Sequence, residues 1–412
     1  MKKLNMAIIG CGKRGTGLVR NVLLNMEDVE IIALCDLYLD KAETLAASVE
    51  ERSSRRPLIS ADHKEILDLP DLDAVLISTS WETHIPLAID AMKKGVPTAL
   101  EVCGAYSIQS LWDLVHTWEE TKTPFMFMEN CCFGKTELLG TSLVRNGILG
   151  EIVHCHGCYG HYLPYEIAAG VEDRHYRLRN YLSRNCENYP THELGPIAKL
   201  LNINRGNQML SLVSVASKSL GLQDYVNRNA EKYPHLVGKT FAQGDIVNTI
   251  ITCADGSTIS LRLDTTLPRS YAREFTVRGT GGLYEQNTNL VYLYGEKEYW
   301  ETDQYYRDNH NNAERFEKDY LPAAWQSITP EDIERGHGGM DAIEFRVFVD
   351  ALKNNEEMPI DVYDAAAWMS ITALSAQSIA QGGMPQAIPD FTSGMWTVRP
   401  PKDVVELPVV GK

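Results

Sequence analysis

Three glycines and a downstream carboxylate near the amino terminus have the spacing of a dinucleotide-binding turn. Gly10, Gly12 and Gly15 form a G-x-G-x-x-G motif that follows an apolar run and precedes apolar residues at helical spacing. Asp36 ends the next apolar run, about 20 residues later, where a carboxylate accepts the ribose hydroxyls of NAD. Glycines let the backbone approach the pyrophosphate, whose charge then faces the start of a helix. The motif predicts NAD binding; a plain turn between a strand and a helix is the alternative.

The residues beside the motif indicate which dinucleotide fits. Asp36 would repel a 2′-phosphate and so favours NAD over NADP, although Lys13 and Arg14 could partly offset that repulsion. Arg14 could equally be a solvated residue of the turn.

Two further polar segments, residues 78–84 and 101–104, end apolar runs of the same expected sheet. They supply these cofactor candidates: Trp81, Glu82, Thr83, His84, Glu101 and Val102. In open α/β sheets ligands lie beyond the carboxyl ends of the strands, so both segments are expected beside the nicotinamide ribose. Alternatively, Thr83 or His84 only caps a helix that begins near Pro86.

The elements that must position these residues alternate between short apolar runs and helical stretches, which is typical of a parallel sheet. The expected strands are 4–9, 30–36, 74–77, 98–102 and 125–128, and two of the helical stretches are 85–93 and 107–119. We therefore predict a doubly wound Rossmann domain over residues 1–130.

After Gly150 the strands follow one another directly, which predicts a mainly antiparallel sheet. The expected strands are 151–160, 209–217, 245–254, 257–266, 272–279 and 289–294, with a turn at 279–282, and helices are expected at 192–203, 340–352 and 363–381. Residues 161–188 and 300–338 show little periodicity and are expected to be irregular. The prediction is an α/β chain whose second domain, 131–385, is α+β with a large open sheet, followed by an extended tail at 386–412.

Charge and cysteine content narrow the possible partners and the compartment. The chain of 412 residues has 55 acidic and 39 basic residues and a formal net charge of −16, the wrong sign for holding nucleic acid or an anionic membrane. Its nine cysteines lie mostly in apolar runs, which favours free thiols and a reducing compartment. No run approaches the roughly 20 apolar residues that span a bilayer. We expect a cytoplasmic protein.

The order of these motifs resembles the glucose-fructose oxidoreductase/inositol dehydrogenase/MocA family over nearly the full length of the chain. The shared layout is a strand end reading Ser/Thr-x-x-x-x-His, a strand end that contains a glutamate, and then an antiparallel sheet. Ordinary dehydrogenases of that family read Glu-Lys-Pro at the second strand end, and the lysine assists proton transfer from the sugar hydroxyl. This chain reads Glu101-Val102-Cys103, which argues against simple sugar dehydrogenase activity.

A narrower resemblance is to glycoside hydrolase family 109, the NAD-dependent α-N-acetylgalactosaminidases. The residues that carry it are the Tyr-Pro-Thr-His block at 189–192, together with 129–133, 336–341 and 361–368. The chain departs from the family at Glu187, within Cys-Glu-Asn where Gly-Asn-Leu is common, and at Glu193, where glycine is common. Both departures lie near the sugar in that family, so the substrate could differ.

This resemblance implies two sets of site residues. Against NAD it implies Arg14, Asp36, Trp81, Glu82, Thr83, His84, Glu101, Val102 and Asn130. Against the sugar it implies Tyr159, Arg177, Tyr189, Pro190, Thr191, His192 and Tyr271.

The chemistry available to such a site is hydrolysis without net oxidation. Oxidation of the sugar at C3 acidifies the hydrogen on C2, a base removes it, and the substituent on C1 leaves; water then adds and the hydride returns to C3. This scheme needs a base of tuned pKa, for which tyrosine or histidine is suited. We expect His192 and Tyr159 to be the acid/base partners, with Tyr189 and Tyr271 orienting the sugar. In the alternative, His192 caps a helix and the tyrosines only pack.

Two other functions remain open: an NAD-dependent sugar dehydrogenase, and a sensor that binds NAD and sugar without catalysis. In each case the partner is a small sugar or glycoside. The open sheet face predicts a homo-oligomer. No metal is expected, because His154, His156 and His161 do not form a recognisable ligand set.

Overall fold

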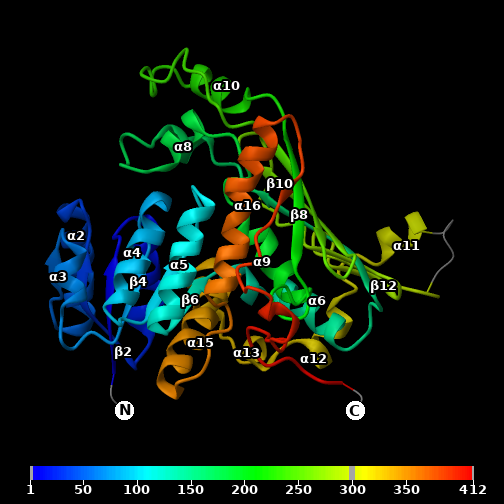
Figure 1. Ribbon diagram of the computed structural model, residues 1–412, viewed down its shortest axis with the longest axis horizontal. Helices are drawn as coiled ribbons and strands as arrows, with labels where there is room; N and C mark the ends of the chain where they lie inside the picture. Colours follow the sequence, from blue (N-terminus) through cyan, green and yellow to red (C-terminus); the bar gives the residue numbers. More distant parts are fainter. Residues whose placement is uncertain (1–2, 297–301, 411–412) are drawn as a thin grey trace. The chain divides into compact units, whose positions relative to one another are not determined.

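Alternating strands and helices near the amino terminus build a six-stranded parallel sheet in the computed structural model, which describes residues 3–296 and 302–410 (Figure 1). The strand order is β3-β2-β1-β4-β5-β6, so the direction of winding reverses between β1 and β4. The strands are β1 Leu4–Ile9, β2 Val29–Cys35, β3 Leu58–Ser60, β4 Ala74–Ile77, β5 Thr98–Glu101 and β6 Phe125–Met128. All four residues of β4 are buried, as a strand covered on both faces requires. The predicted Rossmann fold is confirmed.

Helices cover this sheet and connect its strands. α2 packs on β2, and α4 packs on β4 and β5. The helical elements here are α1 Lys13–Asn21, η1 Leu23–Asn25, α2 Leu39–Ser53, α3 His63–Leu67, α4 Trp81–Lys93, α5 Ile108–Thr121 and η2 Asn130–Phe133. The helix expected near Pro86 begins at Trp81 instead, so the proline lies inside it.

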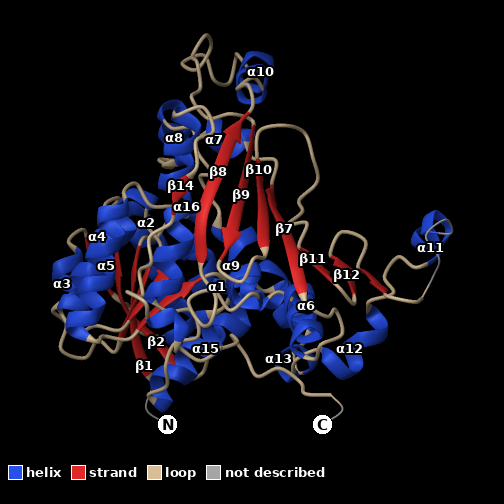
Figure 2. Ribbon diagram, turned by 45° about the vertical axis from the view of Figure 1, so that its right-hand side comes forward, coloured by secondary structure: helices blue, strands red, loops and turns tan. Residues whose placement is uncertain are grey.

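The second sheet has eight strands in the order β13-β12-β11-β7-β10-β9-β8-β14, and Figure 2 shows several of them side by side in red. Apart from the parallel pair β7 and β10, neighbouring strands are antiparallel. They are β7 Ile152–Gly160, β8 Met209–Ala216, β9 Ile246–Cys253, β10 Thr258–Asp264, β11 Thr276–Gly279, β12 Gly282–Glu285, β13 Leu290–Leu293 and β14 Gln386–Ala387. In β9 buried residues alternate with more exposed ones, which is typical of a sheet with one open face. The predicted mainly antiparallel sheet is confirmed.

The remaining helices follow β6 in the chain, and one of them, α9, packs against β7 and β10. These helices are α6 Lys135–Arg145, α7 Pro164–Ala168, α8 Arg177–Ser183, α9 Thr191–Leu200, α10 Gly221–Arg228, α11 Thr302–Asp308, α12 Glu314–Tyr320, α13 Ala323–Gln326, α14 Pro330–Glu334, η4 His337–Gly339, α15 Met340–Asn354, α16 Val362–Ala380 and η5 Met395–Thr397.

Several sequence-based expectations for irregular segments were wrong. Residues 161–188 contain α7 and α8, and 300–338 contains α11 to α14, apart from residues 300 and 301, which lie outside the described residues. These helices have four to seven residues, too few for a periodic pattern, and such short helices depend on tertiary packing. The strand β12 was not expected; it begins at Gly282, the last residue of the expected turn at 279–282. The tail that was expected to be extended contains a short strand, β14, which pairs with β8. Residues 411 and 412 of the tail lie outside the described residues.

The chain divides into two compact units that do not follow its linear order. One unit comprises Met1–Phe133 and Ala324–Ala366, and the other comprises Gly134–Ala323 and Ala367–Lys412. The domain boundaries at 130 and 385 expected from the sequence therefore differ from these units, because α15 belongs to the unit of the parallel sheet. The periodicity of α15 indicates a helix but not the sheet that the helix joins.

All nine cysteines lie among the described residues, and each is a buried free thiol. Within residues 3–296 and 302–410, no helix combines the length and the apolar character that a membrane crossing needs.

Candidate functional site

Two of the three glycines of the first turn, Gly10 and Gly15, are required by close backbone approaches. Gly10 has φ +105°, and a Cβ there would lie 2.5 Å from the Ser78 carbonyl oxygen. A Cβ on Gly15 would lie 2.1 Å from the Gly10 carbonyl oxygen, whereas one on Gly12 would meet no atom within 4 Å. Gly12 is the N-cap of α1, so no side chain caps the start of this helix. The first and third glycines thus form the turn, and the second leaves space beside the start of the helix.

Asp36 is half-buried directly after β2, and the backbone orients its carboxylate. Asp36 Oδ2 accepts a hydrogen bond from Cys11 N at 2.7 Å, and Oδ1 accepts one from Tyr38 N at 2.8 Å. This arrangement holds the carboxylate beside the glycine turn, as a ribose-binding acid requires.

Arg14 is held by two carboxylates and is not a solvated turn residue. Its Nη1 donates to Asp341 Oδ2 at 2.8 Å and its Nη2 donates to Asp341 Oδ1 at 3.1 Å, while Nη2 lies 2.9 Å from Glu101 Oε1. Although burial alone would lower the pKa of Arg14, Glu101 and Asp341 raise it well above its ordinary value. A guanidinium engaged in this way contributes little to neutralising a 2′-phosphate, which strengthens the preference for NAD expected from Asp36.

Asp341 also fixes Asn130, a second residue that the resemblance assigns to the cofactor. Asn130 Nδ2 donates to Asp341 Oδ1 at 2.7 Å, and His337 Nδ1 lies 2.9 Å from Asp341 Oδ2. Burial opposes ionisation of Asp341, but Arg14 and His337 lower its pKa below the ordinary range, so it is a carboxylate. Asp341 therefore organises Arg14, Asn130 and His337.

Asp341 was not among the site residues predicted from the sequence, although the glycine-rich block before it was a usable signal. Gly336, His337, Gly338 and Gly339 all have positive φ, between +42° and +96°. A Cβ on Gly336 would lie 2.7 Å from Asp341 Oδ2. The glycines form the turn that places the Asp341 carboxylate at the start of α15.

The segment after β4 forms the first turn of α4. Trp81 and His84 are buried, and burial lowers the pKa of His84 to about 4, so the ring is neutral near neutral pH. Thr83 Oγ1 donates to the Ser80 carbonyl oxygen at 2.9 Å, a local bond of the kind expected if Thr83 supports the helix start. Glu82 is half-buried in the same turn.

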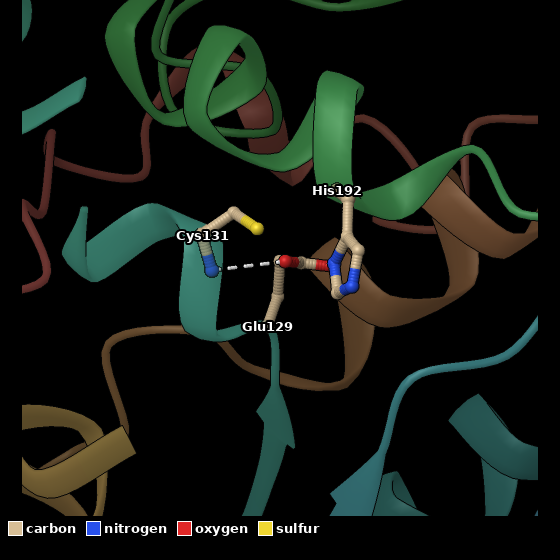
Figure 3. Close-up of side chains that lie close together, drawn as sticks. All are labelled: Glu129, Cys131 and His192. Atoms are coloured by element: carbon tan, nitrogen blue, oxygen red, sulfur yellow. Dashed lines mark hydrogen bonds between the residues drawn. The ribbon is translucent and has the colours of Figure 1, made fainter. Parts of the chain in front are cut away.

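The ends of β5 and β6 contribute further buried groups. Glu101, the last residue of β5, and Val102 are each 4% exposed, and Asn130 follows β6. Next to Asn130, Glu129 Oε1 accepts a hydrogen bond from Cys131 N at 3.1 Å, as Figure 3 shows. Arg14, Glu101 and Asn130 are therefore brought together at the carboxyl ends of parallel strands.

In the other unit, an aromatic cluster joins the end of β7 to the start of α9. The ring centroids of Tyr159 and Tyr189 are 4.8 Å apart, those of Tyr189 and His192 4.8 Å, and those of Tyr159 and His192 5.5 Å. His192, drawn in Figure 3, is the second residue of α9, whose N-cap Pro190 makes no side-chain cap bond. Three of the residues expected at the sugar thus form one cluster.

Arg177 belongs to this cluster although it comes from a different helix, α8. Its guanidinium carbon lies 5.1 Å from the centre of the Tyr189 ring, and its Nε lies 2.9 Å from Glu166 Oε1. Burial raises the pKa of Tyr159 above its ordinary value and Arg177 opposes that rise, so the phenol is protonated near neutral pH.

The remaining residues expected at the sugar differ in exposure. Pro190 and Thr191 are buried, and Thr191 Oγ1 has no hydrogen-bond partner among the described residues. Tyr271 is 48% exposed, and its ring centroid lies 5.2 Å from that of His161. The Tyr159 hydroxyl is 3.2 Å from His161 Nδ1, so His161 links Tyr159 to Tyr271.

His154 and His156 face side chains of β10. His154 Nδ1 lies 2.9 Å from Thr258 Oγ1, and His156 Nδ1 lies 2.8 Å from Ser260 Oγ.

Both departures from the family motif are buried carboxyl groups. Glu187 is 0% exposed and Glu193 is 2% exposed. Burial raises the pKa of Glu187 to about 8, although backbone N–H groups and the Glu193 side chain counteract the rise. Glu187 N donates to Ser375 Oγ at 2.9 Å, which fixes the segment before Tyr189.

We expect Glu187→Gln to flatten the pH dependence of stability. The pKa of Glu187 is raised from 4.5 to about 8 on folding, so the folded chain holds this proton more tightly than the unfolded chain. The free energy of unfolding of the wild type must therefore fall as the pH rises from 4.5 to about 8. Glutamine does not titrate, so this pH-dependent part of the stability is absent in Glu187→Gln. Urea unfolding at several pH values measures the slope. Glu172→Gln, at an exposed glutamate, should keep the wild-type slope; a wild-type slope in Glu187→Gln would contradict the prediction.

Comparison with known proteins gives a family for both parts of the chain. Residues 4–128 match the model of the oxidoreductase family with an NAD-binding Rossmann fold, and residues 133–398 match the C-terminal domain of glycosyl hydrolase 109. A glycosyl hydrolase family 109 protein of Stenotrophomonas maltophilia is 35% identical, over 97% of this chain and 91% of the relative. An alpha-N-acetylgalactosaminidase of Tannerella forsythia is also 35% identical, over 97% of this chain and 88% of the relative.

Solved structures share the fold at low sequence identity. Myo-inositol 2-dehydrogenase of Lactobacillus plantarum has a TM-score of 0.64 at 15% identity, covering 94% of this chain and 100% of its own. An oxidoreductase of Agrobacterium radiobacter, solved in complex with NAD+, L-tartaric acid and magnesium, has a TM-score of 0.65 at 15% identity, covering 95% of this chain and 99% of its own. On the family models and the relatives that match nearly its whole length, the chain belongs to glycosyl hydrolase family 109 and carries that family's NAD-binding Rossmann domain.

Proposed function

We propose that this enzyme hydrolyses α-N-acetylgalactosaminide-like glycosides by transient oxidation of the sugar at C3. The observation that carries the proposal is the cluster of Tyr159, Tyr189 and His192, which gathers protonatable rings beside the Arg177 guanidinium. The Tannerella forsythia relative, named alpha-N-acetylgalactosaminidase, supports the choice of sugar. Val102, in place of the lysine of ordinary dehydrogenases, argues against net oxidation of a free sugar.

The residues of the Rossmann domain fit NAD. The open space beside Gly12 suits the pyrophosphate, because a Cβ there would meet no atom within 4 Å. The Asp36 carboxylate, held by Cys11 N and Tyr38 N, suits the ribose hydroxyls. When bound, NAD accepts a hydride from the sugar and returns it later in the same turnover.

The chain's own groups would handle the protons. Tyr159 is a protonated phenol near neutral pH, so it can donate a proton to a leaving oxygen. Arg177 would stabilise the phenolate that forms, because a cation near a phenol favours its ionised form. His192 is the candidate base for the hydrogen on C2, and Tyr189 and Tyr271 would orient the sugar.

We also propose a cytoplasmic location and a homo-oligomer. The nine buried free thiols support a reducing compartment. On the open face of the second sheet, Val215 is 52% exposed and Ile250 is 47% exposed, which supports contact with another copy of the chain.

Hydrolysis of p-nitrophenyl α-N-acetylgalactosaminide in deuterated water tests the proposal. We expect release of nitrophenol, deuterium at C2 of the sugar product, and no net rise in NADH absorbance. Hydrolysis without deuterium would remove the oxidative mechanism. Net NADH formation with a free sugar would indicate a dehydrogenase, and binding without turnover would indicate a sensor.

A further inference from the structure

Four buried carboxyl groups gather at the carboxyl ends of β5 and β6; we call them the acidic cluster. Glu101 ends β5, Glu129 follows β6, and Asp341 and Glu344 lie in the first turns of α15. They are between 0% and 4% exposed. Arg14 pairs with two of these four carboxyl groups, those of Glu101 and Asp341.

Glu344 is the member that the described part of the chain leaves unsatisfied. It is 0% exposed, and neither of its carboxyl oxygens has a hydrogen-bond partner among the described residues. Burial, then Glu101 and Asp341, raise the pKa of Glu344 well above its ordinary value; Arg14 opposes the rise and Glu129 adds to it. Glu344 is therefore a neutral acid near neutral pH, poised to ionise if a positive charge arrives.

The nicotinamide ring is the part of NAD that changes charge, being cationic in NAD+ and neutral in NADH. Ligands of such sheets lie beyond the carboxyl ends of the strands, and Glu101 and Asn130 are among the residues that family resemblance assigns to the cofactor. The acidic cluster is thus next to the residues expected to border this ring. Buried negative groups in a medium of low dielectric strongly attract the positive charge of the NAD+ ring.

We propose that the acidic cluster makes the Rossmann domain bind NAD+ in preference to NADH, and that Glu344 gives up its proton when NAD+ binds. The inference rests on NAD binding and extends it to the oxidation state. A cluster that stabilises the cationic ring of NAD+ favours return of the hydride to the sugar. The enzyme would then hold NAD+ when the next substrate binds.

Four charged groups act on Glu344, and they come from different parts of this unit. Glu101 belongs to β5, Glu129 follows β6, Arg14 lies on α1, and Asp341 lies on α15. His337 contacts two of these groups, with its Nδ1 2.9 Å from Asp341 Oδ2 and 3.0 Å from Arg14 Nη1. Arg14 and Asp341 already neutralise each other, so a new cation is felt most by Glu344.

Binding of each oxidation state to Glu344→Gln tests the inference. Titrations of cofactor-free protein should give tighter binding of NAD+ than of NADH in the wild type. Glutamine keeps the shape of the protonated acid but cannot ionise, so NAD+ affinity should fall about tenfold while NADH affinity changes less than about twofold. Asp350→Asn, on the same helix but exposed, is the matched control and should change neither. Equal changes for both forms, or none, would overturn the inference.

Proton release by the wild-type protein gives a second measurement that needs no variant. Calorimetry in two buffers of different ionisation enthalpy should show up to one proton released per NAD+ bound and none per NADH. Equal release with both forms would overturn the inference while leaving NAD binding intact. Failure of both dinucleotides to bind would instead overturn the cofactor assignment itself.

Discussion

Replacing His192 with alanine is expected to lower kcat for glycoside hydrolysis by about 100- to 10,000-fold, the usual contribution of a positioned acid or base. His192 lies at the start of α9 with its ring centroid 4.8 Å from that of Tyr189 and 5.5 Å from that of Tyr159. Its removal takes away the candidate base and changes none of the residues expected to bind NAD. NAD affinity, measured by titration, should therefore remain within about twofold of wild type, so that the loss appears in kcat.

The matched control for this change is His235→Ala, at an exposed histidine of the same unit. It should retain wild-type kcat. Tyr159→Phe removes the second partner and should also lose most activity, because phenylalanine cannot donate a proton. Added imidazole should restore part of the activity to His192→Ala and none to Tyr159→Phe. A His192→Ala enzyme with nearly full kcat would show that this ring only packs against the tyrosines.

Alanine at Gly15 is expected to abolish tight NAD binding, because its Cβ would lie 2.1 Å from the Gly10 carbonyl oxygen and 2.5 Å from Ser78 Oγ. Two pieces of backbone must separate to admit it, which costs about 1–3 kcal/mol of unfolding free energy. Since this movement also displaces the turn that faces the pyrophosphate, NAD affinity should fall by about 100-fold or more, equivalent to about 2.7 kcal/mol. Thermal unfolding and NAD titration measure the two effects.

Two neighbouring glycines separate folding from binding. Gly17→Ala introduces a Cβ with no atom within 4 Å outside its own helix, and should stabilise α1 by about 0.5–1 kcal/mol without changing NAD affinity. Gly12→Ala should fold normally yet weaken NAD binding, because its methyl group occupies the space left for the pyrophosphate. Wild-type NAD affinity in both Gly12→Ala and Gly15→Ala would contradict the assignment of the turn.

Sequence periodicity was sufficient for the main elements of the fold and insufficient for its short ones. The apolar runs at 4–9 and 74–77 match β1 and β4, because buried parallel strands are continuously apolar. The helix α8, Arg177–Ser183, has only seven residues, two of them arginine, and is too short to show a periodic apolar stripe. Its stability comes from buried Leu178 and Tyr181, which only the tertiary structure reveals.

For the candidate site, local motifs indicated residues but not the contacts between them. The glycine motif and Asp36 could be recognised together from the sequence because they lie within a single strand-helix-strand unit. The bond from Arg14 to Asp341 spans more than 300 residues, and no local pattern encodes such a separation. Glu344 gave no signal at all, since a glutamate in a helix is ordinarily solvated and only the fold shows it to be buried.

The origin of the first unit in two distant chain segments has a consequence for synthesis on the ribosome. The last strand of the parallel sheet, β6, ends at Met128, whereas α15 begins at Met340, more than 200 residues later. At about 5–20 residues per second, tens of seconds of translation separate the two segments. During that interval the nascent Rossmann sheet lacks Asp341, and Arg14 lacks the carboxylate that holds both of its terminal nitrogens. Arg14 therefore acquires this carboxylate only after most of the polypeptide has been made.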